Sequence, residues 1–400
     1  MRDLNVLNGV RIISFTQFLL GPAGVQYLAD LGADVVKVEP PAGAWERHWS
    51  GGEHYLDGTS VFHLLTNRNS RSIAIDLKQP QGRAIAQRLA ETADVIVQNY
   101  RPGVIERLGI GYEELRKRNP KVIYVSASGY GSEGPYRDLP GQDLLVQAMT
   151  GLAHITGTAD GPPTAAASPV VDHHGATLLA LGVLAALLHR INTGEGQHVK
   201  LTMVQAALDL QREPIAYHLN GFPIERSQSG LATNYHPAPY GIYKTQDGYL
   251  ALSVSPMKAL YEATQDDRLK DFLGPRDAWE KRDEIRAAVV EMMAEKTTDQ
   301  WIVPLRAHGV WVQRVNSYAD CFEDPAVRQL DPVMEVEMGH AEPVKLLKFP
   351  IEFAAGSPAL RYPPPEIGEH TTDVLKEAGY PEEEIERLLR ARVVVAKREG

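Results

Sequence analysis

The chain has 400 residues, a formal net charge of −10 at pH 7, 44% hydrophobic residues and 23% charged residues. This composition is typical of a folded globular protein that is long enough for two domains, and it argues against collagen-like, disordered and membrane proteins. The acidic balance also argues against general binding of nucleic acid or anionic membranes, because proteins that follow phosphate groups carry a basic excess. We therefore expect any phosphorylated ligand to bind at a local basic site.

Strand-like and helix-like patterns alternate in the first half of the chain. Strands are predicted at 10–15, 35–38, 72–77, 95–98 and 122–126, and helices at 23–31, 81–91 and from 104 onwards. A long helix at 173–189, a short strand at 199–203 and a helix at 204–219 follow. This βαβ alternation predicts an α/β fold in which helices cover both faces of a mostly parallel sheet.

The texture of the sequence changes after Gly221. A turn-rich segment, a hairpin at 241–244 and 248–254, and charged helices across 258–309 predict a second, smaller α+β domain. The tail, with prolines at 363–365 and an amphipathic helix at 382–392, resembles a segment that returns to pack elsewhere. We expect a large domain at 1–205 completed by 335–400, a linker at 206–228, a small domain at 229–325, and a linker with the returning tail at 326–400.

Cysteine usage and apolar runs narrow the class of protein further. The single cysteine, Cys321, excludes an intrachain disulfide and any CxxC motif and suits a reducing compartment, so that we expect the protein to be cytoplasmic. Residues 10–20 loosely resemble a secretory signal, but polar residues interrupt them and we read them as mature sequence. The longest apolar stretch, 176–188, has 13 residues, fewer than a membrane span requires, and predicts a buried core helix.

One stretch of the chain is basic although the whole is acidic. Residues 67–118 contain ten Lys and Arg residues against six Asp and Glu residues, a net charge of +4. Most of these side chains are expected to lie on solvated helix faces, but the stretch is where a small anion would find a local basic site.

Several motifs suggest familiar chemistry without meeting its requirements. Residues 129–134 (GYGSEG) match GxGxxG after a predicted strand, but prolines at 135 and 140 exclude the helix that a dinucleotide fingerprint needs. His173 and His174 are adjacent, so on a helix they diverge by about 100° and cannot share a metal ion. The sequence contains no P-loop and no HExxH motif. We expect no metal site and no permanently bound cofactor.

Asp172 is an acidic residue in an unusual setting, because it directly precedes the most apolar helix of the chain. The structural interpretation is an N-cap, in which the carboxylate accepts hydrogen bonds from the first-turn amides. The functional interpretation is a reactive carboxylate at the same position. A carboxylate at a helix N-terminus stays ionised, and the N–H donors beside it can stabilise an oxyanion.

Further motifs recur in a fixed order along nearly the whole chain. The sequence resembles the class III CoA-transferases of the formyl-CoA transferase and carnitine CoA-transferase type, which share their fold with α-methylacyl-CoA racemase. The resemblance rests on LNGVR at 7–11, LGADVVKVE at 31–39, NRNSRS at 67–72, NYRPG at 99–103, SGYGSEGP at 128–135, TGEGQ at 193–197 and GEHT at 368–371. It implies a Rossmann-like large domain with an inserted small domain, and two ring-shaped subunits that interlock into a homodimer.

The resemblance also implies a mechanism. Asp172 stands at the position of the nucleophilic aspartate, which would form an acyl-aspartyl anhydride and then an aspartyl-CoA thioester. With a reference pKa of about 3.9, we expect it to be ionised at neutral pH and to need no general base. Racemases of this fold pair the aspartate with a histidine, and this chain has Gln142 there, so that transfer is favoured and Gln142 is expected to orient the substrate.

By the same resemblance, acyl-CoA binds as a substrate along the basic stretch. The residues implied are Leu77, Lys78, Asn99, Tyr100, Arg101 and Arg107, with Arg47 as a further phosphate partner. The segment 229–240, with His236 and Tyr240, resembles members that take succinyl-CoA or other dicarboxylic acyl groups, although these two residues could equally pack a turn. The alternatives are a racemase-like isomerase and a non-catalytic relative that binds acyl-CoA.

Overall fold

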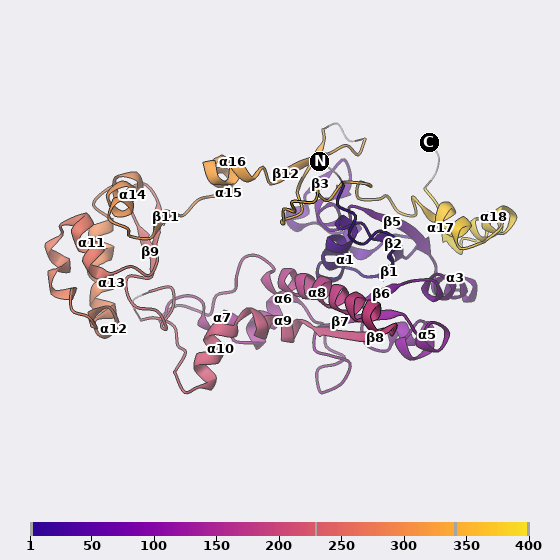
Figure 1. Ribbon diagram of the computed structural model, residues 1–400, viewed down its shortest axis with the longest axis horizontal. Coiled ribbons are helices and arrows are strands. Elements are labelled where there is room, and N and C mark those ends of the chain that lie inside the picture. The colour runs from indigo at the N-terminus through magenta and orange to yellow at the C-terminus, as the bar shows by residue number, and fades with distance from the viewer. Residues whose placement is uncertain (1–2, 229, 340–341, 398–400) are drawn as a thin grey trace. The chain divides into compact units, whose positions relative to one another are not determined.

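The computed structural model describes residues 3–228, 230–339 and 342–397, so the predicted boundaries at 1, 229 and 400 lie outside the described residues. The chain divides into two compact units (Figure 1). The first unit contains residues 1–146, 169–210 and 332–400, and the second contains 147–168 and 211–331. The predicted division into domains and linkers stays a prediction.

A seven-stranded sheet forms the centre of the first unit (Figure 1). Its strands are, from edge to edge, β14 Val394–Val395, β5 Ser70–Ile75, β2 Asp34–Glu39, β1 Arg11–Phe15, β6 Val95–Gln98, β7 Ile123–Ser128 and β8 Gln197–Thr202. All neighbours are parallel except the edge pair of β14 and β5, which is antiparallel. The predicted α/β fold with a mostly parallel sheet is therefore confirmed, and the tail supplies its edge strand.

Helices cover both faces of this sheet, because successive apolar residues on its strands point to opposite sides. Ile12 belongs to a buried cluster with α1 and α8, whereas Ile13 belongs to a second cluster with α3, α5, α17 and α18. The helices are α1 Leu20–Asp30, α2 Val61–Leu64, α3 Pro80–Glu91, α4 Val104–Arg107, α5 Tyr112–Arg118, α6 Asp143–Met149, α8 Val170–Thr193, α9 Met203–Leu210, α17 Thr371–Glu377 and α18 Glu382–Arg390. Shorter elements are the 3-10 turns η1 Trp45–Arg47 and η2 Gly51–Glu53, and the strand pairs β3 Tyr55–Leu56 with β4 Thr59–Ser60 and β12 Val333–Val336 with β13 Val344–Leu347.

The second unit has its own antiparallel sheet and core. β9 Gly241–Lys244 and β10 Tyr249–Leu252 form the predicted hairpin, and β11 Val312–Arg314 pairs with β10. Tyr243, Leu250 and Trp301 are among the buried side chains of this core. The helices are α7 Leu152–Ile155, α10 Arg212–Leu219, α11 Met257–Thr264, η3 Asp267–Phe272, α12 Asp277–Glu280, α13 Arg282–Met293, α14 Thr298–Ala307, α15 Tyr318–Glu323 and α16 Pro325–Leu330.

The prediction of one helix over 204–219 is wrong. The structure has two helices there, α9 and α10, which are separated by Gln211. Pro214 has no N–H to donate to the carbonyl of Leu210, and its ring would clash with that carbonyl in a continuous helix. Both halves of the predicted helix are therefore helical, and Pro214 explains the break between them.

Helix α8 is long and apolar enough to cross a membrane by length and composition alone, and 44% of its apolar window is buried inside the structure. Its buried face includes Val171, Gly175, Leu179 and Val183 at helical spacing, and this face packs against α1 and α9. The predicted core helix at 176–188 is thus buried on one face only.

Glu39, at the end of β2, is a buried carboxylate at the centre of a hydrogen-bonded network. It accepts from Arg47 Nε and Nη2, both at 2.7 Å, from the backbone N–H of Ala44 at 2.9 Å and from Ser72 Oγ at 2.5 Å. Burial alone would raise its pKa, but Arg47 and the other donors lower it from the usual 4.5 to about 2. Since Ser72 also accepts from the backbone N–H of Gly368, this network joins β2 and β5 to the tail.

We expect Glu39→Gln to lower the free energy of unfolding at pH 7 by about 3 kcal/mol, because it leaves a buried guanidinium without its partner. The lowered pKa means that the ionised Glu39 stabilises the fold above pH 4.5, and that this stabilisation is lost as the pH falls towards 2. Urea denaturation at pH 7 and pH 3 measures both effects. Glu335→Gln on the exposed side of β12 is the control, and equal stabilities for the two variants would contradict the prediction.

Candidate functional site

The carboxyl ends of the parallel strands meet at one edge of the sheet, and the strand order reverses at β1. The chain passes from β1 to β2 on one side and later to β6 on the other, which leaves a crevice where ligands bind in doubly wound folds. Asn99, directly after β6, holds the loop after β1, since its Nδ2 donates to Gln17 O at 2.8 Å and its Oδ1 accepts from Gln17 N at 2.9 Å. Phe18, the next residue, has a left-handed φ of 64°, which is unusual for a bulky side chain and marks a constrained loop.

Six of the predicted CoA-binding residues lie along this edge. Leu77 and Lys78 follow β5, Asn99, Tyr100 and Arg101 follow β6, and Arg107 ends α4. The side chains of Lys78, Arg101 and Arg107 are exposed, and none of the three forms an ion pair within the described part of the chain. They are therefore available to an anion.

Other basic residues of the +4 stretch are already used by the fold. Arg68 forms a buried ion pair with Asp30 at 2.6 Å, and Arg71 bridges Asp34 at 2.8 Å and Glu377 at 2.6 Å. Arg116, Lys117 and Arg118 pair with surface carboxylates. The stretch thus divides into structural cations and the available cations at the sheet edge.

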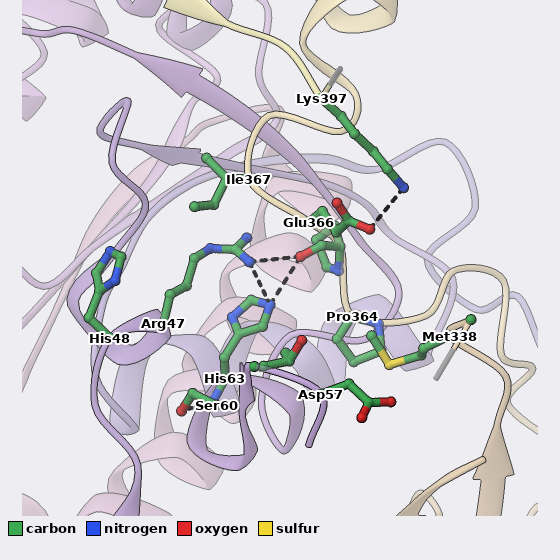
Figure 2. A pocket seen from close by; sticks show the side chains of 14 residues that line it. Arg47, His48, Asp57, Ser60, His63, Met338, Pro364, Glu366, Ile367 and Lys397 are labelled. Atoms are coloured by element: carbon green, nitrogen blue, oxygen red, sulfur yellow. Dashed lines mark hydrogen bonds and ion pairs between the residues drawn. The ribbon is translucent and has the colours of Figure 1, made fainter. Parts of the chain in front are cut away.

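Arg47 lies beside a separate cavity of about 700 Å³ in the first unit (Figure 2). Its guanidinium is bound to Glu39, and its Nη1 also contacts Pro365 O at 2.9 Å and His63 Nε2 at 3.1 Å. His63 is buried, and its pKa is lowered well below 6.5 by burial and by the positive charge of Arg47, so it is neutral. Arg47 therefore holds the tail in this structure and has little capacity left for a phosphate.

Asp172 lies in the first turn of α8, one residue beyond Val171, and is not the N-cap. The N-cap residue is Pro169, which has no capping side chain. Instead Asp143, at the start of α6, accepts hydrogen bonds at its Oδ2 from the backbone N–H groups of Val171 at 2.8 Å and Asp172 at 3.0 Å. The prediction of an N-cap at Asp172 is thus wrong, because a carboxylate from another helix occupies the first-turn donors.

The same arrangement places two carboxylates close together. Burial and, to a lesser extent, the charge of Asp143 raise the pKa of Asp172 from its usual 3.8 to about 7, against the opposing effect of a hydrogen bond from the backbone N–H of Leu20. The expectation that Asp172 is fully ionised at neutral pH is corrected, since a pKa of about 7 leaves roughly half of the molecules protonated at pH 7. No cation pairs with this carboxylate among the described residues.

Close packing of α1 on α8 brings Leu20 to Asp172. Gly24 on α1 faces α8, and a Cβ at this glycine would lie 2.9 Å from the carbonyl oxygen of Ala176, too close for any side chain. Gly175 likewise faces Leu20. These glycines let the N-terminal turn of α1 reach the first turn of α8.

Gln142 is exposed directly before Asp143, at the end of the glycine-rich segment. This segment folds back on itself, since a Cβ at Gly129 would lie 2.5 Å from Gly141 Cα. The next helix begins only at Asp143, which agrees with the rejection of a dinucleotide fingerprint. Asp143 itself was not singled out from the sequence, because local patterns give no sign that a residue caps a helix 28 positions away.

In the second unit, the segment 230–240 forms an aromatic cluster. His236 stacks on Tyr240 with ring centroids 4.4 Å apart, and its Nδ1 lies 2.8 Å from Thr233 Oγ1. Arg282 Nη2 donates to Thr233 O at 2.7 Å. His236 and Tyr240 thus pack this turn, and their predicted part in acyl-group selection stays a prediction. Within the described residues, no group of three or more His, Cys, Asp and Glu side chains could hold a metal ion.

Comparisons with known proteins agree along most of the chain. Residues 7–371 match the family model described as CoA-transferase family III. A protein of Fusarium pseudograminearum named acyl-CoA transferase is 34% identical over 95% of this chain and 86% of its own length. The succinyl-CoA:glutarate CoA-transferase of Mus musculus is 33% identical over 98% of this chain and 91% of its own length. The crystal structure of Rv3272 from Mycobacterium tuberculosis matches with a TM-score of 0.81 and 31% identity, over 93% of this chain and 100% of that one.

The raised pKa of Asp172 predicts a stability effect. The folded chain binds this proton more tightly than the unfolded chain, so the stability that Asp172 contributes is lost as the pH rises from about 4 to 7. Asp172→Asn cannot ionise, and we expect it to be more stable than the wild type by a few kcal/mol at about pH 8, with a smaller difference at pH 5. Urea denaturation at both pH values measures the difference, and Asp138→Asn on the surface is the control. Parallel pH profiles for the wild type and Asp172→Asn would refute the prediction.

Proposed function

Because the chain belongs to CoA-transferase family III, we propose that it transfers CoA from an acyl-CoA to a free carboxylic acid with Asp172 as the nucleophile. The family membership predicted from the motifs, and with it the enzyme class, is confirmed by the match over residues 7–371. The observation that carries the nucleophile assignment is a partly buried carboxylate with a raised pKa and no cationic partner among the described residues. Such a group is unfavourable for the fold and is typical of a reactive site.

The proposed reaction exchanges one thioester for another. The ionised carboxylate of Asp172 attacks the acyl carbonyl and forms a C–O bond. The C–S bond then breaks, which releases CoA as a thiolate and leaves an acyl-aspartyl anhydride. The thiolate then attacks the aspartyl carbonyl, which releases the first acid as its carboxylate and leaves an aspartyl-CoA thioester. The incoming carboxylate reverses both steps, so no net proton transfer is needed. Gln142 beside this site would orient the acid or an anhydride oxygen through its amide.

Acyl-CoA would bind along the carboxyl edge of the sheet. Lys78, Arg101 and Arg107 supply positive charge for its phosphates, and Leu77, Asn99 and Tyr100 would line the adjoining crevice. We leave Arg47 out of this site, because its guanidinium is bound to Glu39 and Pro365. In this proposal acyl-CoA takes part as a substrate and is not a permanently bound cofactor.

We propose a dicarboxylic acyl donor such as succinyl-CoA. The relative from Mus musculus is named for succinyl-CoA and glutarate, and segment 230–240 of this chain resembles members with such substrates. A racemase would need a second acid–base group at position 142, and an amide cannot serve as a general base. Uptake of solvent deuterium at the α-carbon of a 2-methylacyl-CoA would instead support the racemase, and CoA binding without any transfer would support the non-catalytic alternative.

We also propose a cytoplasmic, ring-shaped and interlocked homodimer, in which a small domain is inserted into the large one. The resemblance to the family supports this architecture, and so does the way the chain leaves the first unit and returns to it. Light scattering on the purified protein tests the dimer, because a mass equal to one chain would contradict it.

Asp172→Ala should abolish transfer. With succinyl-CoA and a panel of carboxylic acids, we expect the wild type to form new CoA esters that mass spectrometry detects, and the variant to form none. Asp138→Ala is the matched control, since that aspartate is exposed and its one ion pair among the described residues is with Arg137. Transfer by Asp172→Ala at the wild-type rate would disprove the aspartyl mechanism.

Lys78→Ala and Arg107→Ala should each raise the KM for acyl-CoA, by about tenfold if each contributes one charge-assisted contact, and leave kcat nearly unchanged. The effect should shrink at high ionic strength, because exposed charges are screened. Arg116→Ala removes a surface cation that pairs with Glu113 and serves as the control. If all three variants behave alike, CoA does not bind at this edge.

A further inference from the structure

A network of three hydrogen bonds runs from the beginning of β8 across β7 to the end of β6, towards the proposed CoA site. The backbone N–H of Tyr100 donates to Gln98 Oε1 at 2.9 Å, Gln98 Nε2 donates to Ser126 Oγ at 2.9 Å, and Ser126 Oγ lies 2.9 Å from His198 Nε2. The strand register places Gln98 directly beside Ser126, and His198 beside Tyr124. His198 thus reaches the turn after β6 although it lies about one hundred positions further along the chain.

The direction of the hydrogen bonds follows from the groups themselves. The N–H of Tyr100 requires an acceptor, which fixes the amide of Gln98 with its oxygen towards Tyr100 and its nitrogen towards Ser126. The hydroxyl of Ser126 then accepts from Gln98 and has its own proton to donate to His198 Nε2. In the neutral tautomer of His198 that carries its proton on Nδ1, Nε2 accepts this hydrogen bond, and that tautomer is assigned from the hydrogen-bonded network.

The surroundings of His198 hold its ring in place. Tyr112 lies against the ring with centroids 4.6 Å apart, and Tyr124 meets it edge-on at 5.3 Å. Burial and the charge of Lys200 lower its pKa below the usual 6.5, whereas Glu113 and Glu106 oppose that shift. Burial and the positive charge of Lys200 thus favour the neutral imidazole, against the opposing charges of Glu113 and Glu106.

This hydrogen-bonded network lies in the wall of a cavity of about 690 Å³. The residues that line the cavity include Gln98, Tyr100, Ser126 and His198. Gln98 is 6% exposed. Bulk water therefore cannot readily replace Ser126 as the hydrogen-bond acceptor for the amide nitrogen of Gln98. Without Ser126 the Gln98 Nε2 would lose its acceptor, and without His198 the hydroxyl of Ser126 would lose a partner; in either case the acceptor that Gln98 offers to the N–H of Tyr100 is held less firmly.

We propose that His198 is a positioning residue for acyl-CoA, which acts through Ser126 and Gln98 on the turn formed by residues 99–101. The inference rests on the proposed function, since it assumes that this turn binds CoA. In this proposal His198 acts on CoA binding through the turn, which it helps to keep in the conformation that binds. Protonation of His198 would turn its Nε2 into a donor to Ser126 Oγ, so that the hydroxyl proton of Ser126 would lose its acceptor and the far end of this hydrogen-bonded network would rearrange.

The test compares two substitutions of His198. His198→Phe keeps a flat ring against Tyr112 and Tyr124 but removes the acceptor, and we expect it to weaken CoA binding and raise the KM for acyl-CoA roughly two- to tenfold, with kcat nearly unchanged. His198→Gln restores an acceptor near the position of Nε2 and should bind CoA like the wild type. Equal losses in both variants, or a fall in kcat alone, would overturn the proposal.

Calorimetric titration with CoA at pH 7.5 and pH 5.5 adds a readout that packing alone would not change. The wild type should bind CoA more weakly at the lower pH, whereas His198→Gln should show a smaller pH dependence. Ser126→Ala provides an independent variant, and the double variant Ser126→Ala with His198→Phe should bind no more weakly than Ser126→Ala alone. Additive losses in the double variant, or the same pH dependence in His198→Gln and wild type, would contradict the hydrogen-bonded chain.

Arg107→Ala in the same titrations separates this proposal from the proposed function. If Arg107→Ala weakens CoA binding and His198→Phe does not, the CoA site stands and the positioning role of His198 is disproved. If Arg107→Ala has no effect, CoA binds elsewhere and both proposals are wrong. Thermal denaturation of each variant identifies any that fails to fold, and Ser126→Ala then carries the test.

Discussion

The hydrogen bonds from the first turn of α8 to Asp143 are the constraint on which the candidate site depends. They fix where α8 begins, and so they fix the position of Asp172 near the N-terminal turn of α1. They also place a second carboxylate beside the first, which adds to the effect of burial on the pKa of Asp172. One contact between α6 and α8 thus sets both the geometry and the electrostatics of the proposed nucleophile.

The basic residues of the first unit have two separate functions in the structure. Arg47, Arg68 and Arg71 are bound to carboxylates and hold the strands, the tail and α17 together. Lys78 and Arg107 lie exposed at the carboxyl edge of the sheet without ion pairs in the described residues. The net charge of the basic stretch could not reveal this division, since pairing depends on carboxylates that lie far away in the sequence.

Much of the fold was predictable because the parallel strands are buried on both faces and follow a regular βαβ order. The predicted sheet and hairpin were confirmed. The match to the family model confirmed the family, which was predicted from the order and spacing of several motifs and not from any single residue. The errors have physical causes. Apolar periodicity predicted one continuous helix where Pro214 divides the chain into two. The prediction of an N-cap at Asp172 was wrong because Asp143, which is distant in sequence, accepts hydrogen bonds from the first-turn amides. The pKa of Asp172 likewise depends on burial and on this neighbour, which a reference value omits.

The raised pKa of Asp172 gives a reason for using a carboxylate in this place. In the proposed reaction, the negative charge of Asp172, which pairs with no cation among the described residues, would move from the carboxylate to the CoA thiolate. Such an acylation would remove the desolvated charge from the carboxylate, and a more basic carboxylate is also a better nucleophile. A lower pKa would increase the ionised fraction at pH 7, but it would stabilise the ground state that the reaction must leave. The pKa of about 7 balances these two requirements near neutral pH.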